Sequence, residues 1–449
     1  SLGYYVGSQN TENNISPELA KKIELYNQEE MDNKFRVLDI CPFCGEMNIH
    51  TKFSTKDWQI IHECKSCNEK LPLYSIDDEI YRYLPSVIVG TVDKLAMIGT
   101  SPKFKLLFGE NSGYCQTHGF MNKDKCDKCG GRLTKIGLID PVYTLSIQDE
   151  LHLVRESLGT FAAHYESFLN YYTSNLIRNE YRKKIKYIAA TATISNYEEH
   201  VINLYNKNAR NFPFSIKGRN YYSYIDENDI SRYILGFAPY GGSIIDGIQK
   251  SVTIFRELIL QCVNNDIFYN DVKGLGYQGD MTALNQILMR YLIQIVYHNS
   301  KSDTRELASA LQNQGNNYLQ SKGYQQYNLA EISGDSDFKD IRGVIYEIQK
   351  ETDKRLAPNL IMATSSISHG VDESSFNSIY FFGMPNNTAE YIQAYSRVGR
   401  TYPGIVIDII RLMRDRDKSY LKNFNLFHQY RDKLVEPVPI NRWAKNAIY

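Results

Sequence analysis

The stretch YIQAYSRVGRTYPG, residues 391–404, decides how the rest of the chain is interpreted. Gln393 stands in a segment that the pattern predicts to be helical, and Arg397 and Arg400 follow it, each beside a small residue or glycine. On an isolated surface helix such a pair would be solvated charge. Guanidinium groups also stay charged and bind phosphate oxygens through two parallel hydrogen bonds. Other motifs in the chain have to decide between these two interpretations.

The composition is that of an ordinary globular protein. A length of 449 residues predicts two or three domains. Hydrophobic residues make up 43% and charged residues 23%, and the formal net charge is zero. A nucleic-acid partner would therefore have to be held by local patches or by backbone donors, because the overall charge does not attract it.

Membrane spans and export signals are not expected. The sequence has no run of about 18 apolar residues, which a spanning helix needs. The first residues, SLGYYVGSQN, lack a basic region followed by an apolar core. We therefore expect a cytoplasmic protein without a membrane partner.

Seven of the eight cysteines lie before residue 130 in two groups, which predicts two zinc sites. The first set consists of Cys41, Cys44, Cys64 and Cys67, and the second of Cys115, His118, Cys126 and Cys129. The first has the C-x2-C…C-x2-C spacing of a zinc ribbon, in which tight turns aim thiolates at one ion. Four ligands close each site, so both zinc ions would be structural rather than catalytic. Disulfides or free thiols are the alternative for the first set, and a loop histidine beside a spare thiol for the second.

Polar residues follow short apolar runs in the middle of the chain. In GLIDPVYTLSIQDELHL the apolar run leads into Asp149 and Glu150, and in KKIKYIAATATISN it leads into Thr191 and Thr193. Such residues at the carboxyl ends of buried strands stand where open α/β sheets bind ligands. One carboxylate there can hold Mg²⁺ through water, and its neighbour can polarise the water that attacks a phosphoryl group. Each motif alone is weak, because acidic pairs and hydroxyls are common at strand ends.

The second half repeats a strand-then-helix rhythm. The strand-like runs are LIQIVYH, NLIMATSS, SIYFFGMP and PGIVIDII, and amphipathic helical segments follow several of them. This alternation predicts a mostly parallel sheet covered on both faces.

The order DELH (149–152), TAT (191–193), ATSSISHGVD (363–372) and QAYSRVGR (393–400) resembles superfamily 2 helicases and translocases. The last motif departs from the family's Gln-x-x-Gly-Arg-x-Gly-Arg at Ser396. The resemblance implies an α/β fold of two RecA-like parallel-sheet domains with a zinc-ribbon insertion. The first of these domains would be incomplete in this sequence. In this family the two domains hold ATP and nucleic acid crosses both.

A closer resemblance, to the helicase component of the bacterial DISARM anti-phage system, covers nearly the whole chain. It rests on VGTVDKLA (89–96), QDELHLVRESLGT (148–160), the motifs above, MPNNTAEYIQAYSRVGRTYPG (384–404) and VEPVPINRW (435–443). It implies a DNA-dependent ATPase acting in defence, with DNA and other subunits of the system as partners.

The resemblance also implies roles for the residues around ATP and Mg²⁺. Asp149 would coordinate Mg²⁺ through water, and Glu150 would orient the attacking water. Gln393, Arg397 and Arg400 would sense the γ-phosphate.

Four further residues would contact or respond to the nucleotide by the same resemblance. Thr191 and Thr193 would couple the nucleotide state to the grip on DNA. Gly370 and Asp372 would close on the sugar side of the nucleotide.

Three residues match positions that contact the nucleic-acid backbone in this family. They are Thr91 in VGTVDKLA, and Thr364 and Ser365 in ATSS. Contacts from hydroxyls and main-chain N–H groups need no net positive charge, which agrees with a neutral chain.

The phosphate-binding Walker A motif is missing from this sequence, which contains neither Gly-Lys-Ser nor Gly-Lys-Thr. The chain is then either the second part of a longer or split helicase or a degenerate ATPase-like scaffold. The intact Asp149–Glu150 and Arg397–Arg400 pairs favour the first, with ATP hydrolysis only beside a Walker A-bearing segment or partner. The rival class of function is a zinc-ribbon module that binds DNA or protein while the ATPase-like part is inert.

These motifs give an expected domain organisation. Residues 1–36 form a leading helical segment, and residues 37–135 form the zinc-binding insertion. Residues 136–210 complete the first RecA-like domain, residues 211–412 form the second, and residues 413–449 form a tail.

Overall fold

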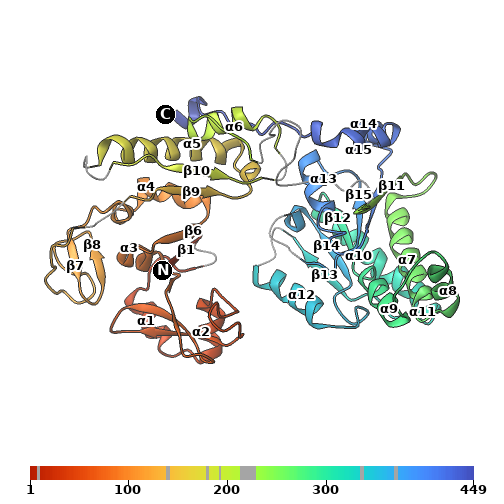
Figure 1. Ribbon diagram of the computed structural model, residues 1–449, viewed down its shortest axis with the longest axis horizontal. Helices are drawn as coiled ribbons and strands as arrows, with labels where there is room; N and C mark the ends of the chain where they lie inside the picture. Colours follow the sequence, from red (N-terminus) through yellow and green to blue (C-terminus); the bar gives the residue numbers. More distant parts are fainter. Residues whose placement is uncertain are drawn as a thin grey trace. The chain divides into compact units, whose positions relative to one another are not determined.

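The computed structural model describes residues 1–7, 11–137, 142–177, 182–191, 194–212, 229–333, 338–368 and 373–448. The chain divides into two compact units (Figure 1). Unit 1 comprises residues 1–191, 196–210 and 438–449, and unit 2 comprises residues 192–195 and 211–437. Within the described ranges, no helix combines the length and apolar composition that a membrane span requires.

Unit 2 is built on a six-stranded parallel sheet. The strand order is β11-β16-β15-β12-β14-β13, and every neighbouring pair is parallel. The strands are β11 (Arg232–Phe237), β12 (Gln294–His298), β13 (Leu329–Ile332), β14 (Leu360–Ala363), β15 (Ser378–Phe382) and β16 (Gly404–Ile409). Every residue of β12, β14 and β15 is buried, as expected of central strands covered on both faces.

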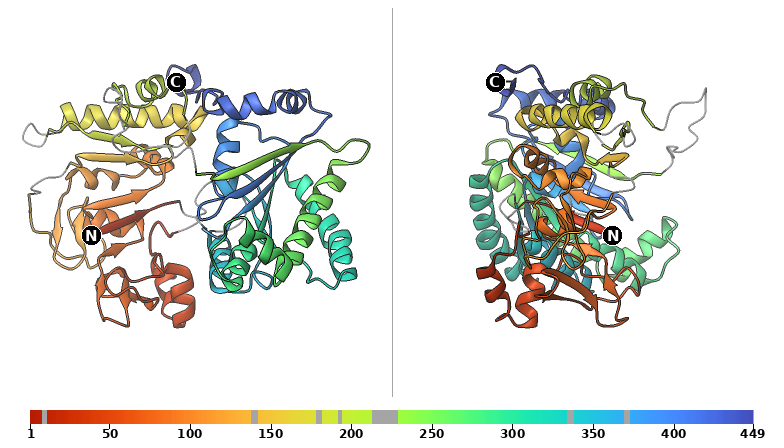
Figure 2. Two further views of the ribbon diagram at one scale, coloured as in Figure 1. Left: turned by 45° about the vertical axis from the view of Figure 1, so that its right-hand side comes forward. Right: turned by 90° about the vertical axis from the view of Figure 1, so that its left-hand side faces the viewer.

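Helices cover both faces of this sheet (Figures 1 and 2). The first face packs on α7 (Ile244–Cys262), α10 (Lys301–Ala310) and α11 (Asn316–Ser321), and the second on α12 (Phe338–Lys350), α13 (Thr388–Tyr395) and α15 (Phe424–Tyr430). The remaining helices are α8 (Asp266–Gly274), α9 (Met281–Arg290) and α14 (Asp415–Lys422). The expected parallel sheet with two helical layers is thus confirmed, and it matches a RecA-like domain.

Local signals explain where several of these helices begin. The side chains of Ser243, Asp280 and Ser300 each accept a hydrogen bond from a backbone N–H in the first turn of the helix that follows. These residues satisfy donors that have no partner inside the helix.

Unit 1 contains two small parallel sheets beside two antiparallel ones. The parallel sheets have the orders β5-β1-β6 and β10-β9, and the antiparallel sheets β2-β3-β4 and β7-β8. The strands of the parallel sheets are β1 (Leu2–Tyr5), β5 (Leu73–Tyr74), β6 (Val87–Gly90), β9 (Leu145–Gln148) and β10 (Lys186–Ala189). The antiparallel strands are β2 (Ile49–Ser54), β3 (Gln59–Cys64), β4 (Lys70–Leu71), β7 (Gly113–Cys115) and β8 (Gly119–Met121).

Helices of unit 1 connect and flank these sheets. They are α1 (Pro17–Ile23), α2 (Gln28–Phe35), α3 (Asp77–Tyr83), α4 (Met97–Thr100), α5 (Glu156–Tyr171), α6 (Tyr197–Tyr205) and α16 (Lys445–Ile448), with the 3₁₀ turns η1 (Val92–Ala96) and η2 (Phe104–Phe108). The segment 1–36 contains β1 as well as α1 and α2. Residues 413–437 are part of unit 2, and residues 438–449 are part of unit 1, so 413–449 is divided between the units.

Candidate functional site

Antiparallel hairpins bring the first four cysteines together. The pairing of Ile49 with Cys64 in β2–β3 sets the turn before β2 beside the turn after β3. The Sγ atoms of Cys41 and Cys67 lie 3.8 Å apart, and those of Cys44 and Cys64 lie 3.6 Å apart. Four thiolates around a tetrahedral zinc, with Zn–S bonds of about 2.3 Å, would stand about 3.8 Å apart. The set therefore fits a zinc ion and is too widely spaced for disulfides.

The second set is a Cys3His cluster around the β7–β8 hairpin. The Nδ1 atom of His118 lies 3.6 Å from the Sγ of Cys115 and 3.4 Å from the Sγ of Cys126, and the Sγ of Cys129 is 3.9 Å from that of Cys115. In each set all four ligand atoms lie within 4.8 Å of one another. Both predicted ligand sets are thus brought together, and both clusters could hold zinc.

A buried arginine of helix α3 binds the β2–β3 turn and the second ligand cluster. Arg82 donates to Asp78 at 3.0 Å, to the carbonyl of Trp58 at 2.6 Å and to the carbonyl of His118 at 2.9 Å. Lys128, in the turn of the second cluster, lies 3.2 Å from Asp78. Burial raises the pKa of Asp78, but the charges of three surrounding basic side chains outweigh it and lower that pKa to about 2. The second ligand cluster is therefore joined to α3 through charged side chains.

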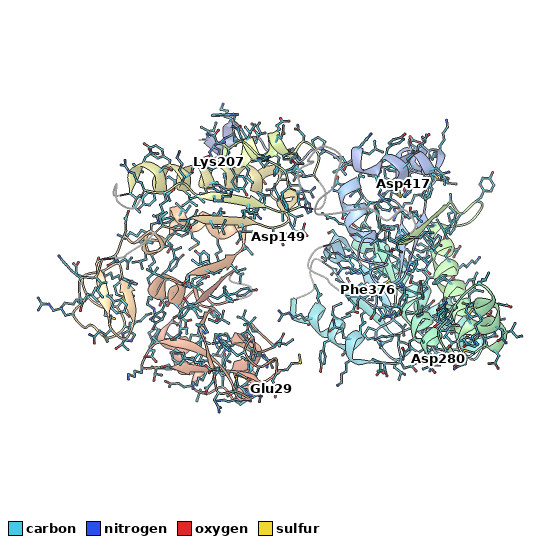
Figure 3. All side chains as sticks on the ribbon, viewed as in Figure 1. Glu29, Asp149, Lys207, Asp280, Phe376 and Asp417 are labelled. Carbon is cyan, nitrogen blue, oxygen red and sulfur yellow. The ribbon has the colours of Figure 1, made fainter. Side chains whose placement is uncertain are left out.

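The predicted acidic pair follows strand β9. Asp149 is exposed at the carboxyl end of this strand (Figure 3), and its Oδ1 accepts a hydrogen bond of 2.9 Å from the N–H of Glu150. Glu150 is partly exposed and has a φ of +47°, which L-residues rarely adopt. Such strained conformations cluster at functional sites. The exposed carboxylate of Asp149 is the hard oxygen ligand that Mg²⁺ prefers.

The residues that directly follow β9 and β10 contact each other within unit 1. Strands β9 and β10 pair in parallel, so both segments leave the same edge of the sheet. The N–H of Leu151 donates to the carbonyl of Ala190 at 2.9 Å, and Nδ1 of His152 lies 3.0 Å from Oγ1 of Thr191. A displacement of either segment would therefore be transmitted to the other.

Thr91 follows β6 and is exposed, with its backbone N–H donating to the carbonyl of Tyr5 at 3.2 Å. The nearby Lys94 is buried, and its Nζ lies 2.6 Å from Asp77 and 3.2 Å from Asn13. The lysine of the VGTVDKLA motif is therefore structural, whereas the threonine hydroxyl is accessible to a ligand.

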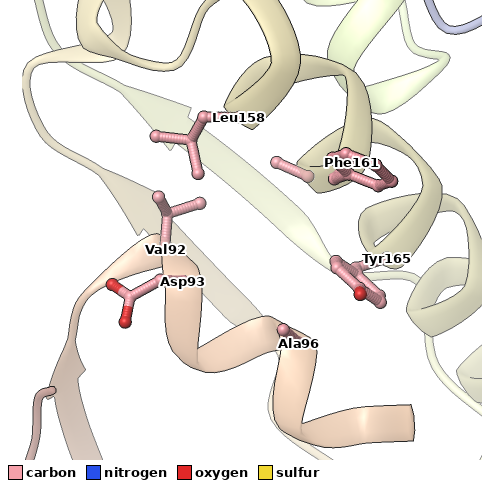
Figure 4. A pocket seen from close by; sticks show the side chains of 7 residues that line it. Val92, Asp93, Ala96, Leu158, Phe161 and Tyr165 are labelled. Carbon is pink, nitrogen blue, oxygen red and sulfur yellow. The ribbon is translucent and has the colours of Figure 1, made fainter. Parts of the chain in front are cut away.

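A pocket of about 320 Å³ lies between η1 and α5 (Figure 4). It is lined by Val92, Asp93 and Ala96 of η1 and by Leu158, Phe161, Ala162 and Tyr165 of α5. Its lining is mostly apolar, so it cannot replace the N–H groups and the lysine of a phosphate-binding loop.

The QAYSRVGR motif covers the end of helix α13 in unit 2 and the turn that follows it. Gln393 is buried in the helix, Arg397 is half-buried, and Arg400 is exposed. Arg232 of β11 donates to the carbonyls of Tyr395 at 3.2 Å, Val398 at 2.7 Å and Ser396 at 3.0 Å. These carbonyls at the helix end have no partner within the helix, and a cation there also suits the helix dipole.

Positive charge is concentrated at this turn. Burial is the main cause that lowers the pKa of Arg232, and the positive charges of Arg431 and Arg400 lower it further. Three guanidinium groups therefore act on one another at this turn.

The N-terminus of α13 is also capped by a residue that lies far away in the sequence. Glu436 accepts hydrogen bonds from the N–H of Thr388 at 2.9 and 3.0 Å and from its hydroxyl at 3.0 Å. An anion at a helix N-terminus is stabilising. Sequence reasoning missed both Arg232 and Glu436. VEPVPINRW marked the neighbourhood of Glu436, but no local signal identifies Arg232.

Gly399 is required by the geometry of the turn. Its φ is +77°, and a Cβ there would lie 2.5 Å from the carbonyl oxygen of Ser231 and 2.7 Å from the N atom of Gly404. Its N–H donates to the carbonyl of Phe376, labelled in Figure 3, at 3.2 Å. Gly399, which stands between the two arginines of the motif, thus lets the backbone of the turn pass close to the backbone of Ser231 and Gly404.

Buried polar side chains join α13 to β16 and α15. The hydroxyl of Tyr391 lies 2.7 Å from Oδ2 of Asp408 in β16 and 2.9 Å from Nε2 of His428 in α15. Asp408 is fully buried, and this burial raises its pKa to about 7.

The predicted DNA-contacting residues of unit 2 follow strand β14. Thr364 is half-buried and donates its N–H to the carbonyl of Ile332 at 3.2 Å, and Ser365 is exposed. Both stand at the carboxyl edge of the sheet. Thr193, Gly370 and Asp372 lie outside the described residues, and their roles stay predictions.

Part of unit 2 matches a family of known proteins. The family described as "Helicase conserved C-terminal domain" matches residues 282–402, which include β12 to α13 and the QAYSRVGR turn. The expected relationship to superfamily 2 helicases is confirmed by this match together with the similarities below.

One curated relative is similar over the whole chain. The DISARM protein DrmA of Bacillus paralicheniformis (strain ATCC 9945a / NCIMB 11709 / CD-2) is 28% identical over 487 aligned residues, covering 100% of this chain and 41% of DrmA.

Two solved structures share the fold. Crystal structures of the DUF1998 helicase MrfA, one bound to DNA and one to DNA and AMPPNP, have TM-scores of 0.54 and 0.51 and identities of 15% and 14%. Both similarities cover 100% of this chain, but only 44% and 46% of the MrfA chains. The chain therefore spans less than half the length of DrmA and of MrfA.

Proposed function

We propose that this chain, which carries the C-terminal part of a superfamily 2 helicase, belongs to a DNA-dependent ATPase of bacterial anti-phage defence, a helicase or translocase. We further propose that it hydrolyses ATP only together with a polypeptide segment that bears a Walker A loop, and that it acts in the cytoplasm. The defence role rests on the similarity to DrmA.

The observation that carries the proposal is the position of the motifs. The acidic pair follows β9, TAT follows its parallel neighbour β10, and the arginine pair follows a helix capped at both ends by charged residues. Such preorganised charges are what phosphoryl transfer requires, because its transition state is stabilised mainly by positioning and electrostatics.

In the proposed reaction Asp149 holds Mg²⁺ through water, and the ion would neutralise charge on the phosphates. Glu150 orients and deprotonates the attacking water, while Arg397 and Arg400 stabilise charge on the γ-phosphate. Gln393 supports the arginine turn. Thr191 and Thr193 couple the nucleotide to DNA, and Gly370 and Asp372 contact its sugar side.

For DNA, we propose phosphate contacts from three hydroxyl residues at strand ends, namely Thr91, Thr364 and Ser365. Residues 37–135 act as a structural insertion that holds two zinc ions.

The test is a pair of substitutions in an assembly that contains the Walker A segment. Glu150→Gln should abolish hydrolysis and retain ATP binding, because it removes the base and leaves the phosphate contacts. Arg400→Ala should lower the rate by about 10³-fold, as arginine contacts to the transition-state phosphate typically do. If both variants hydrolyse ATP at the unmodified rate, these roles are wrong. If the unmodified assembly binds DNA and does not hydrolyse ATP, the chain is a zinc-ribbon scaffold with an inactive ATPase-like part.

A further inference from the structure

The EPVPINR segment, residues 436–442, has no role in the reaction proposed above, yet both of its ends are held by specific contacts. The chain passes from unit 2 into unit 1 between Pro437 and Val438, inside this segment. The first two residues of the segment are therefore anchored in unit 2, and the other five are anchored in unit 1.

The anchor in unit 2 is the helix that leads to the arginine turn. Glu436 accepts hydrogen bonds from the N–H of Thr388 at 2.9 and 3.0 Å and from the hydroxyl of Thr388 at 3.0 Å. Thr388 is buried and is the first residue of α13, which ends where the turn begins. The position of Glu436 is therefore fixed to the helix that carries Gln393 and precedes Arg397.

The next residue is paired with the chain that follows TAT. Pro437 forms a parallel β-bridge with Ser195, and both residues belong to unit 2. Ser195 stands two residues beyond the TAT segment, residues 191–193, which follows β10. The EPVPINR segment is thus also connected to the chain that leaves this motif.

The anchor in unit 1 is the helix that follows DELH. The carbonyl of Pro439 accepts a hydrogen bond of 2.7 Å from the N–H of Glu156, the first residue of α5. Ile440 is buried against Gly159, where an added Cβ would lie 2.9 Å from Cγ1 of Ile440. Glu156 comes four residues after His152, the last residue of DELH, so this anchor lies close to the acidic pair in the sequence.

Further hydrogen bonds hold the end of the segment. The N–H of Asn441 donates to Oγ1 of Thr160 at 3.3 Å. Arg442 donates to the hydroxyl of Ser167 in α5 and, at 3.4 Å, to the carbonyl of Ile202 in α6. Figures 1 and 2 show the C-terminal residues beside these two helices. The anchor in unit 1 therefore extends along α5 and reaches α6.

The sequence makes the crossing between the units stiff. Pro437 and Pro439 each have a φ fixed at about −65°, and a proline restricts the residue before it to extended conformations. Glu436 and Val438 both precede a proline. All four residues are therefore restricted, and proline-rich connections of this kind act as semi-rigid spacers. A displacement of one anchor is transmitted to the other because the crossing has little freedom to absorb it.

We propose that the EPVPINR segment is a stiff tie that keeps the acidic pair of unit 1 and the arginine turn of unit 2 in register, with Glu436 and Arg442 as positioning residues. The inference rests on the proposed function, in which both groups act on one ATP molecule. A misplacement of about 1 Å can lower a rate by about 100-fold. The tie should therefore raise kcat without contributing to the binding of ATP.

Lengthening the crossing tests the tie. Gly-Gly-Ser inserted between Pro437 and Val438 keeps every residue that makes a contact but loosens the connection. In the assembly with the Walker A segment, this insertion should lower kcat by about 10- to 100-fold and leave KM for ATP within about twofold, because the ATP contacts of each unit remain. The same insertion between Gly241 and Gly242, in an exposed loop of unit 2, is the matched control and should change neither constant.

A second variant removes only the stiffness. Pro437→Gly combined with Pro439→Gly keeps the length of the crossing and both backbone carbonyls, and it should lower kcat by at least about threefold. Hydrogen exchange of β12 and α5 shows whether either variant disturbs the folding of a unit. If the insertion does so, the kcat of the double glycine variant decides.

Hydrogen exchange in this chain alone tests the tie without ATP hydrolysis. Glu436→Ala removes the anchor in unit 2, and the amides at the start of α5 in unit 1, residues 156–160, should then exchange at least about threefold faster. Glu436→Gln keeps an acceptor oxygen and should retain the slow exchange. Asp280→Ala is the matched control, because Asp280 caps a different helix of unit 2, α9, by accepting the N–H of Ala283 at 2.7 Å. It should leave the exchange of α5 unchanged.

The outcomes separate this inference from the proposed function. An unmodified kcat in the lengthened variant, or unchanged α5 exchange in Glu436→Ala, would overturn the tie and leave the function standing. Faster α5 exchange in Glu436→Ala, without ATP hydrolysis by the unmodified assembly, would support the connection and refute the function. A raised KM with an unmodified kcat in the lengthened variant would show that the segment serves ATP binding and would overturn the inference.

Discussion

Replacing Gly399 with alanine should destabilise unit 2 and disable the arginine turn. A left-handed backbone conformation costs an L-residue about 1–2 kcal/mol. The added Cβ would also stand 2.5 Å from the Ser231 oxygen and 2.7 Å from the Gly404 nitrogen, which are backbone atoms and cannot rotate away. Overpacking of this kind typically costs about 1–3 kcal/mol, so Gly399→Ala should cost about 2–5 kcal/mol in total.

Gly323→Ala is the matched control. Gly323 also lies in unit 2 and has a φ of +76°, but a Cβ there would meet no atom within 4 Å. Gly323→Ala should cost only the free energy of the left-handed backbone conformation, about 1–2 kcal/mol. The free energy of opening of β15 and β16, obtained from hydrogen exchange in increasing urea, measures both variants. Equal losses in the two variants would refute the steric argument, as would full ATP hydrolysis by a Gly399→Ala assembly.

Three further predictions concern zinc, DNA and pH. The purified chain should contain two zinc ions by elemental analysis. Cys41→Ser should remove one ion and destabilise residues 37–70, since a broken tetrahedral site releases its metal. Metal-free protein with intact thiols would refute this prediction. In the assembly, Thr364→Ala should reduce the DNA-stimulated ATPase rate more than the basal rate, and unchanged stimulation would remove Thr364 from the DNA contact. The pKa of Asp408 is about 7 in the folded chain and lower in the unfolded chain. The contribution of the Asp408 carboxyl to the stability of unit 2 should therefore decrease as the pH rises from about 4 to about 7, and then level off. Asp408→Asn should remove that part of the pH dependence in urea titrations, whereas an unchanged dependence would mean that the carboxyl is ionised.

Local patterns predicted much of the fold. The runs LIQIVYH, NLIMATSS and SIYFFGMP became β12, β14 and β15, because continuous apolar residues mark strands covered on both faces. The spacing of the cysteines predicted both metal clusters, since each two-residue spacing acts within a single turn.

Long-range contacts could not be predicted in this way. Arg232 caps a helix that lies more than a hundred residues further along the chain, and Glu436 caps the same helix from the opposite direction. No periodicity or spacing near either residue reveals its partner. The exposure of Ile147 was also unforeseen, because its run resembles a buried strand and only the structure tells which faces are covered.

We propose that this chain hydrolyses ATP only when a phosphate-binding loop is supplied from outside its sequence. The most direct measurement is the rate of ATP hydrolysis, with and without DNA, for the chain alone and for its assembly with the Walker A-bearing polypeptide. We expect no turnover above background for the chain alone. The assembly should show DNA-stimulated hydrolysis, which Glu150→Gln should abolish. Robust hydrolysis by the chain alone, insensitive to Glu150→Gln and Arg400→Ala, would contradict it.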